Sequence, residues 1–281
     1  MIRRIVVSLA VFALAITASA EGAAAQDSGF SAPGAGAHLN AEQAAQFSKQ
    51  VERDLAAKGA RLAIVFRTGR ARKELPEGIS YTHGAFWAFQ TIKLDDGREI
   101  NGYAVYNLYA GDGKSVPKDK SYLHQDFPID FVAGTAVDDV AVIIPSPEMQ
   151  RRILEVMASP AYAKLHQADY SLISNPLNLK YQNCNEFMLD VIAAAAWETS
   201  DIKQINADLR AHFKPTVVKT GPLQRLFGPM VDSRLKTDDQ KGKIVTATYE
   251  SMAAFMKDND LLQETYILPR DPAAGKKETG G

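Results

Sequence analysis

The single cysteine of this 281-residue chain, Cys184, stands in the run Tyr-Gln-Asn-Cys-Asn-Glu-Phe (181–187), at the expected start of a long apolar helix. A helix N-terminus carries partial positive charge and free N–H groups, which favour a thiolate and can hold a developing oxyanion. The position therefore makes Cys184 a candidate nucleophile. The alternative is a small buried apolar residue, because free cysteine is among the residue types most often buried.

A nucleophilic cysteine needs a base within hydrogen-bond reach, and His83 is the best placed of the five histidines. It lies inside a predicted strand, where alternation puts it on one face with Ala85 and Trp87. We expect the cysteine helix to pack against this face, with Gly84 permitting close approach of another backbone. The alternative is an interior histidine whose hydrogen bond goes to Tyr81 or to a carbonyl group.

The other histidines are weaker candidates. His124 lies in a loop region and is kept as a reserve base. His166 and His212 lie at the ends of polar helices, where a solvated imidazole interacts well with the helix dipole. His38 lies near the N-terminus.

The residue that orients the base should come from the next strand, because antiparallel neighbours place side chains about 5 Å apart across the ladder. Asn107 is the best candidate, since it is a polar amide in an otherwise apolar strand. A buried amide must find hydrogen-bond partners. The alternative is an ordinary hydrogen bond near the strand end.

Three further residues are candidates for oxyanion or substrate binding. Gln182 could help to hold an oxyanion beside the backbone N–H of Cys184, or it could simply face solvent. Arg67 and Arg70 lie in a basic turn that could grip a carboxylate or phosphate. The favoured interpretation of this turn is a solvated charge cluster.

The elements that must position these residues follow from periodicity and turn signals. Asn40 caps a helix over 41–57, which precedes an apolar strand over 62–66. A long strand over 79–94 turns at Asp95-Asp96-Gly97 and returns over 102–109, so these two should be antiparallel neighbours.

Further strands and helices are expected in the second half of the chain. A strand is expected over 137–144 and another over 243–249, and helices are expected over 147–157, 160–167, 184–197, 201–212 and 251–262. Runs of strands followed by helices predict an α+β fold with an antiparallel sheet.

The N-terminus predicts export. Arg3 and Arg4 precede a short apolar run over 5–16 and small-residue cleavage sites, which is the pattern of a secretory signal peptide. A periplasmic or secreted protein is therefore expected, with no transmembrane segment after signal removal. The near balance of 32 basic and 33 acidic residues gives no indication of nucleic-acid binding. One cysteine excludes an intramolecular disulfide.

Together these residues resemble a known group. A histidine on a strand, a polar residue on the next strand and an Asn-Cys pair heading a helix resemble the circularly permuted papain-like superfamily. That superfamily includes lecithin:retinol acyltransferase and bacterial cell-wall hydrolase relatives. The resemblance implies a permuted papain-like core and thiol acyl chemistry without naming the acyl group.

A closer resemblance is to an exported proteobacterial family called domain of unknown function 2145, over roughly 62–262. It implies no established reaction. The segments that carry it are Arg67-Thr68-Gly69-Arg70, Tyr81-Thr82-His83, the run from Gly102 to Tyr109, the run from Asp126 to Phe131, and Tyr181-Gln182-Asn183-Cys184.

These considerations divide the chain into five parts. We expect a signal peptide (1–25), a flexible leader (26–39), a permuted papain-like core (40–212), a C-terminal extension packed on the core (213–268) and a disordered tail (269–281).

The leading functional hypothesis is a cysteine-dependent hydrolase or acyltransferase that acts on an amide or ester. Cys184 would attack, His83 would move the proton and Asn107 would orient His83. The expected substrate is a small peptide or ester, with a cell-wall peptide favoured by the periplasmic location, and no metal or organic cofactor is implied. The alternative is a non-catalytic periplasmic binding or scaffold module, in which Cys184 only contributes to packing.

Overall fold

The computed structural model describes residues 38–94, 96–219 and 234–272. Within them, six strands form one antiparallel sheet in the order β4-β3-β2-β1-β5-β8, with helices on both faces. The α+β prediction is confirmed. The expected signal peptide and most of the leader and tail lie outside the described residues. No helix in the described ranges is long and apolar enough to cross a membrane.

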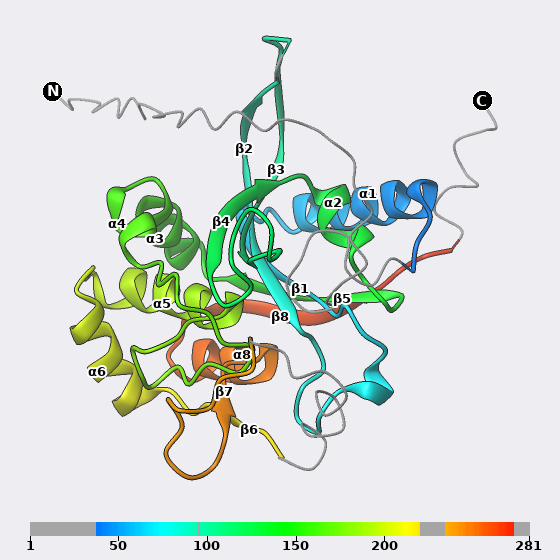
Figure 1. Ribbon diagram of the computed structural model, residues 1–281. Coiled ribbons are helices and arrows are strands. Elements are labelled where there is room, and N and C mark those ends of the chain that lie inside the picture. Colours follow the sequence, from blue (N-terminus) through cyan, green and yellow to red (C-terminus); the bar gives the residue numbers. More distant parts are fainter. Residues whose placement is uncertain (1–37, 95, 220–233, 273–281) are drawn as a thin grey trace, which may run out of the picture.

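The centre of the sheet is formed by β1 (Leu62–Arg67), β2 (His83–Lys93) and β3 (Glu99–Ala110). β2 pairs with both neighbours in antiparallel register, so the expected hairpin is confirmed. The turn end of this β2–β3 hairpin extends well beyond the rest of the sheet (Figure 1). β2 starts at His83 rather than at residue 79, which puts His83 at the end of the sheet rather than in its middle.

The flanking strands differ more from expectation. β5 (Asp139–Pro145) occupies the predicted position, but β4 (Ser121–Asp126) and β8 (Leu262–Pro269) were not predicted. The expected helix over 251–262 is instead α8 (Tyr249–Asp258), which begins at a Thr248 capping box. A positive φ of 57° at Asp260 then turns the chain into β8. The expected strand over 243–249 shortens to β7 (Val245–Thr246), which pairs with β6 (Thr216–Val217).

One face of the sheet is covered by α1 (Ala41–Ala57) and α2 (Pro128–Ala133), which was not predicted. Figure 1 shows these two helices together on one side. Their core contains Val65, Trp87 and Phe131. Residues at odd positions of β1, β2 and β3 therefore point toward α1 and α2.

The opposite face packs against α5 (Cys184–Trp197), whose residues from Cys184 to Ala195 are all buried. Around it lie α3 (Pro147–Met157), α6 (Ile202–His212) and α8, and the short α4 (Pro160–Lys164) follows α3. Thus α8 and β8, from the C-terminal part of the chain, contribute to the same core and the same sheet as the rest.

Candidate active site around Cys184 and His83

Cys184 is the first residue of α5, as the sequence predicts. The Asn183 side chain caps the helix by accepting a hydrogen bond from the Glu186 N–H at 3.0 Å, and it also donates to the Leu172 carbonyl at 3.2 Å. The side chain is thus held by the core on one side and by the helix on the other. This arrangement places Cys184 in the positive end of the helix dipole.

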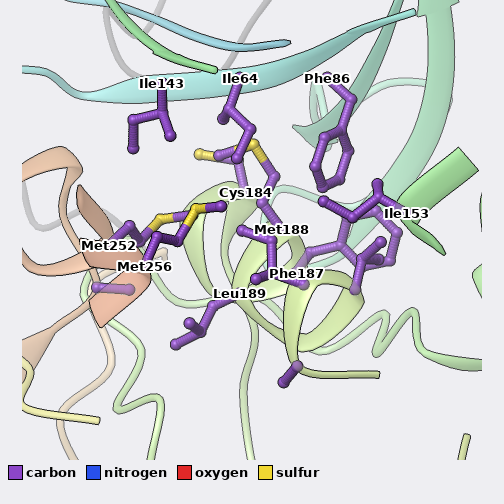
Figure 2. Close-up of a cluster of buried hydrophobic side chains, with 14 of the residues drawn as sticks. Ile64, Phe86, Ile143, Ile153, Cys184, Phe187, Met188, Leu189, Met252 and Met256 are labelled. Carbon is purple, nitrogen blue, oxygen red and sulfur yellow. The ribbon is translucent and has the colours of Figure 1, made fainter. Parts of the chain in front are cut away.

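The Cys184 side chain points into apolar surroundings. Figure 2 shows it beside Ile64 and Met188 in the layer between α5 and the sheet, and only 3% of the residue is exposed. Two of its polar contacts are long: Sγ lies 4.0 Å from the Thr82 carbonyl oxygen and 3.7 Å from Asn185 Oδ1. This burial fits the packing interpretation of Cys184 as well as a protected thiol.

His83 is fully buried and makes the expected contact with Asn107. Its Nε2 lies 2.9 Å from Asn107 Oδ1, and its ring stacks on Tyr109 with centroids 5.3 Å apart. Burial and, to a smaller extent, the charge of Arg67 lower the pKa of His83 to about 3, against the opposing effect of the Asn107 hydrogen bond. The imidazole is therefore neutral at pH 7.

The tautomer of His83 follows from its neighbours. Asn107 Nδ2 donates to Asp126 Oδ2 at 2.9 Å, which orients the amide so that Oδ1 faces the imidazole. Because a carbonyl oxygen only accepts, Nε2 carries the proton and Nδ1 carries a lone pair. Nδ1 is buried and has no hydrogen-bond partner. A neutral imidazole oriented through Nε2 can accept a proton at Nδ1, but a pKa of about 3 makes it a weak general base at pH 7.

Asp126 at the end of β4 completes this network. Besides Asn107 it accepts a short hydrogen bond from the Tyr109 hydroxyl, and its Oδ1 lies 3.0 Å from His124 Nε2. His124, the reserve base, is thus part of the network but half exposed. Asp126 and Tyr109 were not predicted as site residues, although both lie in the segments that carry the closer family resemblance.

Arg67 differs most from its prediction. It is the last residue of β1, it is fully buried, and its guanidinium donates to the Gly134 carbonyl beside the Phe131 ring. Burial lowers its pKa, while Tyr109, Cys184 and Asp126 each raise it by electrostatic attraction. The solvated-turn interpretation is therefore wrong for Arg67. Arg70 is only partly buried and lies in the turn that the Thr68 hydroxyl closes.

The structure corrects the expected placement of His83. Its ring contacts Phe131 of α2, so it lies on the face opposite α5. Gly84 faces α5 instead, because a Cβ there would collide with the Met188 methyl group and come within 2.8 Å of the Phe66 ring. His83 Nδ1 makes no hydrogen bond to Cys184. The two residues nevertheless lie at the same end of β2, and both interact electrostatically with Arg67.

Gln182 does not have the expected role. Its Nε2 donates to the Leu165 carbonyl at 3.0 Å and to Asp190 Oδ2 at 2.7 Å, and its Oε1 accepts from the Gln167 N–H at 2.8 Å. No side-chain N–H remains for an oxyanion, and the residue is 2% exposed rather than solvated. The backbone N–H groups at the start of α5 are the remaining oxyanion donors on this helix.

Comparison with known proteins places the chain among bacterial proteins. A family model described as "Uncharacterized protein conserved in bacteria (DUF2145)" matches residues 54–256, which include every residue of the network described above. No curated protein and no solved structure matches. Among the described residues, no group of three or more His, Cys, Asp and Glu side chains could hold a metal ion.

Proposed function

The chain belongs to the family of uncharacterised bacterial proteins called DUF2145, and we propose that it is a cysteine-dependent hydrolase or acyltransferase that acts on an amide or ester. The observation that carries this proposal is the state of His83. It is neutral, Asn107 and Asp126 hold it through Nε2, and its Nδ1 has no partner. A buried nitrogen without a partner is unfavourable, and a catalytic role is one explanation for it.

In the proposed reaction, Cys184 Sγ attacks the substrate carbonyl carbon while its proton passes to His83 Nδ1. The new S–C bond converts the carbonyl oxygen into an oxyanion, which the N–H groups at the start of α5 stabilise. Collapse of this intermediate breaks the bond to the leaving amine or alcohol, which takes the proton from His83. Water or an acceptor alcohol then releases the acyl group.

This reaction requires Cys184 and His83 to come closer than they are in the resting structure. Sγ lies 4.0 Å from the carbonyl oxygen of Thr82, the residue before His83, but the His83 ring packs on the opposite face of the sheet, so at least one of the two side chains must reorient. Catalytic hydrogen bonds of enzymes without substrate are often long and tighten when the substrate binds. Arg67, close to both residues, would stabilise the thiolate during this step.

The proposed location and substrate rest on the sequence. With a signal peptide at residues 1–25 the protein would be periplasmic or secreted, and a cell-wall peptide amide is the substrate class that this location favours. A papain-like relationship would agree with such a substrate, but fold-level analogy alone carries that link.

A second candidate is a non-catalytic binding module that uses the fold without the thiol. The observation that favours it is the placement of Cys184 among buried apolar side chains, on the opposite side of the sheet from the His83 ring. In this case Cys184 contributes only packing.

The rate of alkylation of Cys184 by iodoacetamide separates the two candidates. If the thiol is catalytic, the native protein should react, with an apparent pKa below that of free cysteine and shifted upward or abolished by His83→Ala. His124→Ala, which alters the exposed end of the same network, is the matched control and should react like the wild type. Reaction only after denaturation, or a native pH profile that His83→Ala leaves unchanged, would favour the binding module.

Substrate assays then distinguish the reaction classes. Peptidoglycan fragments should be cleaved by the wild type and not by Cys184→Ala. Turnover of phospholipid esters instead would assign the acyl chemistry to lipids.

A further inference from the structure

The far side of α5 carries two acidic residues that the thiol chemistry does not use. Glu186 and Asp190 lie about 200° and 240° around the helix axis from Cys184, given about 100° per residue. They therefore point away from the sheet. Both are buried, with 3% and 5% of their surface exposed. Two carboxylates one turn apart in an otherwise apolar helix need a specific reason to be there.

Within the part of the chain that the structure describes, neither acid forms an ion pair. Asp190 Oδ2 accepts a hydrogen bond from Gln182 Nε2 at 2.7 Å, but Glu186 Oε2 is buried and has no hydrogen-bond partner. No described lysine or arginine forms an ion pair with either acid; the charges that act on Glu186 are the negative ones of Asp190 and Asp239. The pair is therefore an electrostatically unfavourable site that a positive charge would relieve.

Burial makes ionisation of both acids unfavourable. Burial raises the pKa of Glu186 well above its usual value, the charges of Asp190 and Asp239 raise it further, and the Ser174 hydroxyl has a smaller opposing effect. Burial also raises the pKa of Asp190 to about 7, opposed by its Gln182 hydrogen bond. Two carboxylates this close titrate as a pair rather than as independent groups.

Both acids line a cavity of about 180 Å³. Its polar wall is rigid, because Gln182 is held by the Leu165 carbonyl and the Gln167 N–H. Its apolar wall consists of Leu165, Leu179 and Ile202.

Two basic side chains also line this cavity. His166 is held at Nε2 by the Ser121 hydroxyl, and burial lowers its pKa, so it is neutral. Lys164 reaches the cavity from the exposed end of α4. Neither neutralises the pair of acids.

We propose that this cavity binds a small organic ammonium ion, with its NH₃⁺ group between Glu186 and Asp190 and its alkyl part against Leu165, Leu179 and Ile202. The three N–H donors of a primary ammonium match the free oxygens of the two acids. An apolar cavity of about 150 Å³ holds benzene, so 180 Å³ suits a ligand of about six heavy atoms. A metal ion is disfavoured, because the described residues offer no group of three or more His, Cys, Asp and Glu ligands.

Calorimetric titration of the full chain with n-pentylammonium at pH 7.5 tests the proposal. We expect saturable 1:1 binding with release of about one proton, seen as a dependence of the binding heat on the ionisation enthalpy of the buffer, because the pair must ionise to hold the cation. The alcohol 1-pentanol, of the same size, should not bind. Absence of amine binding, equal binding of the alcohol, or displacement of the amine by Mg²⁺ would each overturn the proposal.

Variants locate the site. Glu186→Gln and Asp190→Asn should each weaken n-pentylammonium binding at least tenfold, which corresponds to about 1.4 kcal/mol, whereas the exposed control Glu155→Gln should leave it unchanged. Each amide has the shape of a protonated acid, so folding is expected and is checked by circular dichroism. Wild-type affinity in both amide variants would overturn the assignment. Cys184→Ala should bind as the wild type does, which separates this site from the proposed thiol chemistry.

Discussion

Buried carboxylates on the two sides of the sheet are accommodated in different ways. On the α2 side, Asp126 receives hydrogen bonds from Asn107 and Tyr109 and an ion pair from His124. On the α5 side, Asp190 accepts a hydrogen bond from Gln182, while the charge of Asp190 makes ionisation of Glu186 less favourable. The α2 side thus surrounds its buried carboxylate with hydrogen-bond donors, whereas burial on the α5 side makes ionisation of the two acids unfavourable.

The largest expected effect comes from removing the charge on the α2 side. Asp126→Ala leaves the buried Arg67 without one of its attractive partners and removes the acceptor of Asn107 and Tyr109. Breaking a buried charge network from one side costs ~3–5 kcal/mol, so urea unfolding should show a loss of this size. A loss below about 1 kcal/mol would mean that Asp126 is solvated rather than integrated in the network.

The second largest expected effect is a gain in stability when an acidic group is removed from the α5 side. The folded pKa of Asp190 is near 7, while an unfolded aspartate titrates near pH 4. Between these values the folded state binds more protons, so this pair lowers the stability of the wild type as pH rises from about 4 to about 7. The unfavourable contribution persists above pH 7.

Glu186→Gln should therefore stabilise the protein relative to the wild type by ~1–3 kcal/mol at pH 8 and by little at pH 4.5. Urea unfolding of both proteins at the two pH values measures this difference, with Glu155→Gln as the exposed control. A difference that is independent of pH would show that the two acids do not share a proton.

The smallest effect is at the exposed edge of the Asp126 network. The ion pair with Asp126 raises the pKa of His124, so this pair stabilises the fold below pH 6.5 and its contribution is lost as pH rises through the folded value. His124 is half exposed, and such a pair contributes less than ~1 kcal/mol. His124→Ala should thus lower the melting temperature slightly at pH 5.5 and not at pH 9. An equal loss at both pH values would indicate a packing role instead.

Local patterns were sufficient for the elements that carry Cys184 and Asn107. The start of α5, the strand pair β2 and β3, and the contact between His83 and Asn107 follow from capping, hairpin and alternation signals close to those residues. β4 and β8 were missed because edge strands are short or half exposed, so their apolar pattern is weak. The alternating exposure of β8 along Leu262–Pro269 is an example.

Side-chain type and local periodicity are properties of the chain, so they were enough to predict an α+β fold and to indicate which residues could do chemistry. Which side of the sheet each residue faces depends on the packing between elements. Strand alternation relates His83 to Ala85 but does not say which helix covers them, and the close packing of Met188 on Gly84 settled that question. The same holds for Arg67, Asp126 and the Glu186–Asp190 pair, whose partners are distant in sequence and whose burial depends on packing between elements.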